Sequence, residues 1–439
     1  MREASTVLSQ PDKGWSWVVL FGAFWIMFVE GAFMGALGIL HVALLERYDE
    51  SNMRTAMAGS LFGCMTTSGG ILCSALVDRC SCRRVSLTGS LLFTTGLVIC
   101  ALPVSLDVVM LSYGLLAGIG SSLSNTTAFI VVGYNFKKRM NIALGISTSG
   151  IALGSLVMPP LVELLREYYG NRMIFLILGC FSLQQIAMGR LYFPALLEHS
   201  RRHQSRLEKH KSFALKSMWR KWLNILKTPS FVCFTSYLCL LQLGAFVIYL
   251  HLPKFVITMG FTAMQASYLL TVKGVCAFLA RILLAALVNS NSYTTELTTM
   301  MFGTSSFLAI ASILLPFYGQ YFAGLIIFCI FGGLYSDSIF GILNALNSYI
   351  VGPDNFATAT GIEFAVMGFG TLVGPTLVGK VIDVGGTYTF CFSVTGVIIL
   401  LAGILCLISG ALKSKHGDDL NQDPPRQEDR VLESFIDQK

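Results

Sequence analysis

Long apolar runs separated by short polar segments dominate the chain. Residues 85–103 and 390–410 contain no charged side chain, and only 13% of all residues are charged, whereas soluble proteins carry about a quarter. A helix needs about 20 apolar residues to cross the hydrocarbon core of a bilayer. In lipid, such a segment satisfies its backbone hydrogen bonds only as a helix or in a closed barrel. The pattern therefore predicts an all-α membrane protein.

The apolar pattern predicts twelve transmembrane helices. The expected spans are 17–44, 55–77, 85–104, 108–132, 141–163, 172–194, 230–253, 263–288, 294–316, 320–347, 356–382 and 387–411. They divide the chain into a cytoplasmic N-terminus (1–16), a six-helix bundle (17–194), a basic cytoplasmic connector (195–229), a second six-helix bundle (230–411) and a disordered cytoplasmic tail (412–439).

The two predicted bundles share a local sequence repeat. Residues 154–162 match residues 370–378 without a gap, with a proline aligned in both copies, and Gly170 and Gly386 continue the same offset of 216 residues. The matching segments belong to the fifth and eleventh predicted helices. An even helix offset gives two parallel repeats, which is the relation between the halves of the major facilitator fold.

Basic residues gather in alternate loops, where they predict the orientation of the chain. Nine of the 31 Lys and Arg residues lie between Arg201 and Lys227, and two shorter loops carry three each, at 79–84 and 137–139. Because cytoplasmic loops are enriched in Lys and Arg, we expect both termini in the cytoplasm, with the plasma membrane as the location. The same placement explains the net charge of +7 without a nucleic-acid partner.

Three short motifs resemble the monocarboxylate transporter family. Residues 12–17 (DKGWSW) resemble the D-G-G-W-G-W signature of that family, and residues 78–83 (DRCSCR) resemble its N-R-F-G-C-R turn. Residues 136–150 (FKKRMNIALGISTSG), with Lys138 and Arg139, resemble Y-F-x-K-R-R-x-L-A-x-G-x-A-x-A-G. The resemblance spans nearly the whole chain and implies a solute transporter of the major facilitator type.

The motif residues have two possible roles. Trp15 and Trp17 suit the headgroup layer at the mouth of a helix. Asp78, Arg79 and Arg83 either form a cytoplasmic charge lock that breaks during gating or serve as topological anchors.

Ionisable residues inside the predicted spans identify the candidate binding site, because each is costly in lipid unless it is paired or hydrated. Lys273 and Arg281 lie along one stripe of the eighth helix, while Glu30 and Asp337 lie on the first and tenth. Arg281 is the preferred ligand for a substrate carboxylate, because its guanidinium binds bidentately and keeps its charge. The alternatives are a salt bridge that ties helices together for Arg281 and a snorkelling side chain for Lys273.

The resemblance also indicates which coupling residues are missing. Proton-coupled members of the family carry an Asp four residues before the Arg of helix eight, and here that position is Ala277. They also carry a Lys after an A-F pair in helix one, where this chain has Met34 and Gly35. The selectivity-lining Phe of the family falls at Asn344. The resemblance therefore does not carry over the classical proton–lactate relay.

The sequence favours facilitated transport of a monocarboxylate or a related small organic solute. The alternatives are proton-coupled symport that uses Glu30 or Asp337, and a sensor of the same fold that does not transport. An enzyme is not expected, because HExxH, GxSxG and nucleotide-loop motifs are absent, and the six histidines are too scattered to suggest a metal site. No cofactor is expected. The expected partners are the solute and the lipid bilayer, and the resemblance adds a possible single-span immunoglobulin-type partner.

Overall fold

The computed structural model describes residues 12–77, 79–193, 198, 225–290, 294–336, 343, 346–347, 350–351 and 356–422. All regular structure in these ranges is helical. The first half contains α1 (Trp15–Tyr48), α2 (Asn52–Ser68), α3 (Gly70–Val77), α4 (Cys82–Cys100), α5 (Leu106–Val109), the π-helix η1 (Met110–Ala117), α6 (Gly118–Asn135), α7 (Met140–Ser182) and α8 (Gln184–Arg190). The second half contains α11 (Pro229–Thr258), α12 (Ala263–Ser290), α13 (Thr294–Tyr318), α14 (Phe322–Ser336), α16 (Phe356–Asp383) and α17 (Tyr388–Gln422).

Helix is found in each of the twelve predicted spans. The fifth and sixth spans meet in α7, where Gly170 breaks the helical geometry with a φ of 80°. The second span is divided into α2 and α3, which bend by 41°. Within the described residues, eight helical segments are long and apolar enough to cross a membrane, or nine if the bent pair is one span.

One helix end differs from the prediction, and another is not tested. The tenth span was expected to reach residue 347; helix α14 is described as far as Ser336, residues 337–342 lie outside the description, and residues 343, 346 and 347 are helical. Helix α17 runs to Gln422, beyond the end expected at residue 411 and into the predicted tail. Most of the predicted connector lies outside the described residues, and the predicted domain limits stay a prediction.

Glycines bring equivalent helices together in the two halves. A Cβ atom on Gly154 of α7 would collide with the backbone of Phe28 on α1, and one on Gly370 of α16 would collide with the backbone of Cys239 on α11. These two glycines are the first residues of the matching repeat segments. Helices in lipid associate through such close backbone contact, because there is no hydrophobic force between them. The sequence repeat is thus a repeat of packing.

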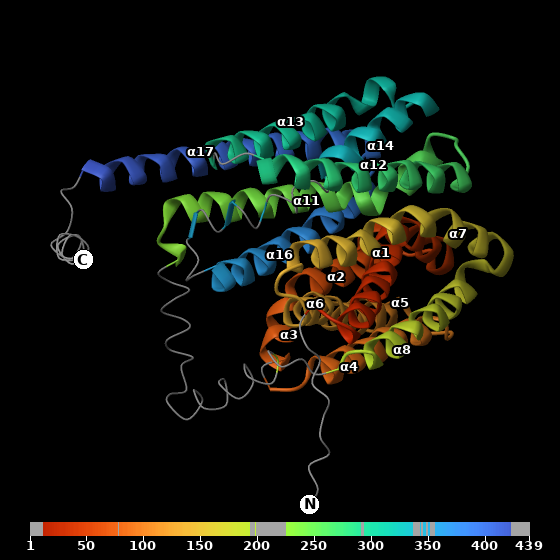
Figure 1. Cartoon of the computed structure of the whole chain (residues 1–439). Coiled ribbons are helices and arrows are strands. Elements are labelled where there is room, and N and C mark those ends of the chain that lie inside the picture. Colours follow the sequence, from red (N-terminus) through yellow and green to blue (C-terminus); the bar gives the residue numbers. More distant parts are fainter. Residues whose placement is uncertain are drawn as a thin grey trace, which may run out of the picture.

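The two halves meet through α2 against α16 and through α7 against α12. Figure 1 shows α11, α12, α13, α14 and α17 (green to blue) on one side and α1 to α8 (red to yellow) on the other, with α16 beside α2. We call the face where α1 and α11 begin the entry face. The face that carries Asp49 and Gly385, where α1 and α16 end, is the opposite face.

Candidate substrate site between the two halves

A small pocket lies at the junction of the halves. It is lined by residues from two helices of each half: Gly35 of α1, Ser155 of α7, Tyr249 of α11, and Leu270, Lys273 and Gly274 of α12. Solute sites in transporters built from repeats lie near the membrane midplane at the repeat interface. The pocket therefore occupies the position where the fold expects a substrate.

Small residues create the crossing that surrounds this pocket. A Cβ on Gly35 would lie 2.6 Å from the Cα of Ser155, so α1 and α7 touch through their backbones. A Cβ on Gly274 would lie 2.9 Å from the Cα of Leu156, which brings α12 equally close to α7. The pocket thus has side chains on some of its walls and bare backbone on others.

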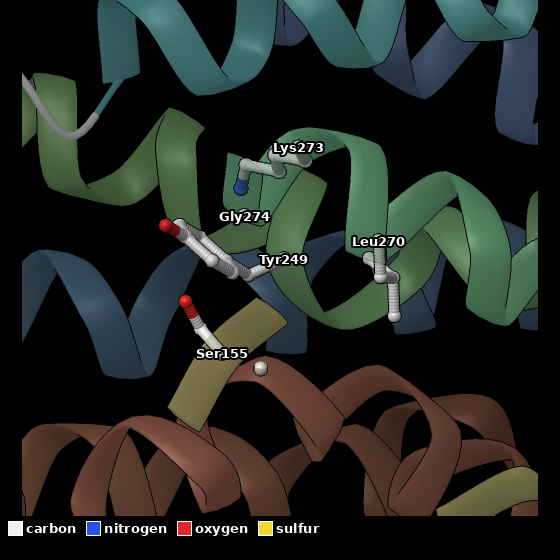
Figure 2. Close-up of a pocket in the computed structure, with 6 residues that line it drawn as sticks. Ser155, Tyr249, Leu270, Lys273 and Gly274 are labelled. Carbon is white, nitrogen blue, oxygen red and sulfur yellow. The ribbon is translucent and has the colours of Figure 1, made fainter. Parts of the chain in front are cut away.

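Lys273 is the charged residue in the pocket lining. Its side chain is buried, with 4% of its surface exposed, and Nζ lies 2.9 Å from the centroid of the Tyr249 ring. In Figure 2 the Lys273 side chain reaches toward one face of that ring, while Ser155 approaches from the side of the first half. A cation over a desolvated aromatic ring gains about 2 kcal/mol. The ammonium group is therefore held inside the protein and does not reach outward to the headgroups.

The other predicted binding residues are placed only in part. Arg281 belongs to α12, two turns after Lys273, but its side chain lies outside the described residues. Asp337 and Asn344 also lie outside them. The predicted grouping of two cations and two acids around one cavity is therefore untested.

Glu30 is buried in the first half and does not line the pocket. It is 3% exposed, and the hydroxyl of Ser121 on α6 donates a hydrogen bond to its carboxyl group. Among the described residues, ion pairs join Arg54 to Glu50 and Asp107 and join Arg166 to acidic residues, and none includes Glu30.

A second buried carboxyl group lies in the second half. Glu363 of α16 is fully buried, and Asn347 donates a hydrogen bond of 2.8 Å to its Oε2. Each half thus contains one acid held by a neutral polar side chain. Both carboxyl groups are therefore buried away from the bulk water.

Two of the family-like motifs contact each other at the entry face. The Asp12 carboxylate accepts hydrogen bonds from the backbone N–H groups of Lys137, Lys138 and Arg139, at 3.2, 3.0 and 3.1 Å. These bonds, with the one from Lys138 as the strongest cause, hold the pKa of Asp12 below its usual value. A carboxylate at this position also suits the positive end of the α7 dipole.

The tryptophans of the first motif complete this contact. Trp15 Nε1 donates to the carbonyl of Leu191 at 3.0 Å, and its ring meets the edge of Phe193. Arg83, from the third motif, stacks over the same Phe193 ring at 5.4 Å from its centroid. Trp17 meets the edge of the Phe136 ring. We call this set of contacts around Asp12, Trp15, Trp17 and Arg83 the entry collar.

The collar lies within one half, which bears on the predicted charge lock. Arg83 stacks on an aromatic ring, while the side chains of Arg79, Lys138 and Arg139 are exposed. Asp78 lies outside the described residues. The gating role proposed for the lock stays a prediction, and the contacts that are described tie helix ends together.

Tyr249 and Ser155 were not predicted from the sequence. A tyrosine in an apolar helix has the pattern of an ordinary core or interfacial residue, and one serine among the many small residues of α7 carries no signal of its own. The available signal was indirect: a buried Lys needs a partner, and aromatic faces in neighbouring helices are suitable ones.

The sequence profile of the Major Facilitator Superfamily matches residues 19–362. The chain belongs to this superfamily. A crystal structure of the peptide transporter POT superposes with a TM-score of 0.72 over 92% of this chain and 97% of that one, at 13% identity, and so supports the fold alone.

Curated relatives confirm the resemblance to monocarboxylate transporters. Monocarboxylate transporter 4 of Gallus gallus is 28% identical over 395 residues, which are 90% of this chain and 82% of the relative. Monocarboxylate transporter 12 of Homo sapiens is 24% identical over 417 residues, with 90% and 81% covered. This member of the Major Facilitator Superfamily is therefore a multi-pass membrane transporter.

Proposed function

We propose that this transporter carries a small organic solute with a carboxylate group, by alternately opening the pocket between its halves to each side of the membrane. The names of its relatives favour a monocarboxylate. The basic loops favour an orientation in which the entry face is cytoplasmic and the opposite face is outside the cell, with the plasma membrane as the location.

The observation that carries this proposal is the position of Lys273. Its buried ammonium lies between the halves, in a pocket lined by both, and a buried charge in a membrane protein marks a substrate or ion pathway. A carboxylate that enters the pocket takes the place of the Tyr249 ring as the partner of Nζ. Arg281, two turns along the same helix, supplies the second cation of the proposed site.

The residues around the pocket favour facilitated transport over the proton–lactate relay of the family. Ala277 stands at the relay Asp position and is buried. Gly35 lies in the segment where the family carries its helix-one Lys, and its lack of a side chain is required by the contact with Ser155. The carboxylate and the lysine of the family relay are thus both missing from these positions.

Uptake into proteoliposomes tests the site. We expect Lys273→Gln and Arg281→Gln each to reduce the initial uptake of labelled L-lactate, or of the best substrate in a panel of monocarboxylates, by about tenfold or more, since one charge-assisted bond contributes about 1.5–3 kcal/mol. Lys380→Gln is the matched control, because it removes an exposed cation from α16. Normal uptake by Lys273→Gln in correctly folded protein contradicts the assignment.

An imposed pH gradient separates the modes of transport. Facilitated transport brings the solute to equal concentrations on both sides at every pH gradient. Accumulation that follows the gradient assigns proton coupling to another acid, with Glu30 and Glu363 as the buried candidates among the described residues. Binding without uptake in every condition identifies a sensor.

A further inference from the structure

Two buried histidines, neither of which lines the candidate pocket, face each other across the junction of the halves. His41 of α1 is 2% exposed and His251 of α11 is 0% exposed, and their rings meet edge to face with centroids 5.0 Å apart. Nearby, a Cβ on Gly38 of α1 would lie 2.7 Å from the Pro253 ring of α11, so the two helices touch at this level. One histidine comes from each half.

The hydrogen bonding of His251 fixes the position of its proton. Its Nε2 lies 3.0 Å from the carbonyl oxygen of Pro375 on α16. A carbonyl only accepts, so Nε2 carries the hydrogen and Nδ1 of a neutral ring has the lone pair. Nδ1 has no hydrogen-bond partner among the described residues. The ring is thus held with a basic nitrogen ready to take a second proton.

The histidines belong to a chain of contacts that closes the opposite face. The centroids of the His251 ring and the Tyr388 ring of α17 lie 5.8 Å apart, and the Tyr388 hydroxyl lies 3.4 Å from Oδ1 of Asn52 on α2. The Asp383 carboxylate of α16 accepts bonds from the backbone N–H groups of Asn52 and Met53, at 2.8 and 2.9 Å. We call the contacts of Asp383 and Tyr388 with the start of α2 the closing clamp.

The surroundings of the closed pair disfavour a positive charge. Lys254, on α11, is close enough to His41 to act on it electrostatically. The Asp383 carboxylate, on α16, is already occupied by the start of α2. Among the other described charges of the opposite face, Arg54 pairs with Glu50 and Asp107, and Arg166 pairs with Glu46 and Glu163. Arg47 and Arg172 bind backbone carbonyls, and Asp49 is exposed at the end of α1. A buried imidazolium here has no counter-ion.

We infer that His251, beside His41, is a proton-binding site that takes up a proton at Nδ1 when the opposite face is open and must release it before the halves close. This inference rests on the proposed alternation of the two halves. In the open state, water reaches both rings and each behaves as an ordinary histidine. In the closed state, the pair stays neutral. Acid on that side therefore favours the open state.

Distance measurements between the halves test the inference. Spin labels at Asp49 and Val384 lie on exposed sites at the opposite face, one on each half. For a single proton and an ordinary histidine pKa, the open-to-closed ratio rises roughly tenfold between pH 7.5 and pH 5.5. We expect this rise in the otherwise unaltered protein. His251→Gln, which keeps a neutral donor for Pro375, should abolish most of it.

Further variants separate a proton site from a structural contact. His251→Lys introduces a group that is cationic in water at both pH values, and it should therefore favour the open state at both. Tyr388→Phe weakens the closing clamp and should raise the open fraction at both pH values while the tenfold dependence persists. A pH dependence that survives in the double variant His41→Gln/His251→Gln overturns the proton site. The proton site is also overturned if the wild type shows two label distances whose populations do not change between the two pH values, although alternation then stands. One unchanging distance in every variant overturns alternation itself.

Discussion

Two aspartates in this transporter make nearly the same contact in two different places. The Asp12 carboxylate accepts hydrogen bonds from backbone N–H groups just before α7, and the Asp383 carboxylate accepts them from the start of α2. Asp12 joins two segments of one half, whereas Asp383 joins one half to the other. The same chemistry therefore joins segments within one half in the entry collar, whereas in the proposed alternation it breaks once per cycle in the closing clamp.

The neighbours of the two aspartates fit this difference. Asp12 lies beside aromatic contacts that involve Trp15 and Trp17, which add packing within the half. Asp383 is helped by the long Tyr388–Asn52 contact and by Gly379, whose missing side chain lets α16 approach the backbone of α2. The collar therefore adds packing within one half, while the contacts of the clamp all cross between the halves.

The largest expected effect comes from filling glycines. Gly154→Leu places a side chain in the backbone of α1 and should abolish recovery of folded protein in size-exclusion chromatography. Gly379→Leu should leave the protein folded, because a Cβ there lies 2.7 Å from the Cα of Met53 and obstructs only the closure of the halves. Uptake should then fall by about tenfold or more. Loss of folded protein in both variants would falsify the distinction between helix contacts within one half and contacts between the halves.

Removing one carboxylate charge gives an intermediate effect. Asp383→Asn should shift the Asp49–Val384 label distances toward the open state by about fivefold, because an exposed charged hydrogen bond contributes about 1 kcal/mol. Asp12→Asn should leave these distances unchanged and lower the melting temperature of the purified protein. If Asp12→Asn also moves the distances, the collar takes part in gating.

The smallest effect is a pH dependence of stability at the collar. The bonds to Asp12 hold its pKa below the ordinary aspartate value of 3.8. Because the folded pKa is the lower one, its contribution is complete well above 3.8 and is lost as the pH falls through the lowered value. The difference in melting temperature between wild type and Asp12→Asn should shrink as the pH falls from about 5 to about 3. An unchanged difference at acid pH assigns the effect to packing.

The sequence was sufficient for the fold but only partly for the site. Apolar length predicted the spans, and the motifs predicted the family that the comparisons confirm. Lys273 was predictable because a charge in an apolar helix stands out. Tyr249 was not, because its role depends on which helix faces Lys273. The contact of Asp12 joins positions 125 residues apart, and His41 and His251 gain meaning only through their pairing across the halves.

The glycine crossing of α7 and α12 has a pharmacological consequence. At Gly274 the two halves touch almost backbone to backbone, so no side chain there can move aside for an inserted group. A compound with the head of the substrate and a bulky tail directed along this seam would act as a wedge. Its potency would depend on the thickness of the tail more than on its polarity, and it would arrest the carrier with the seam held apart.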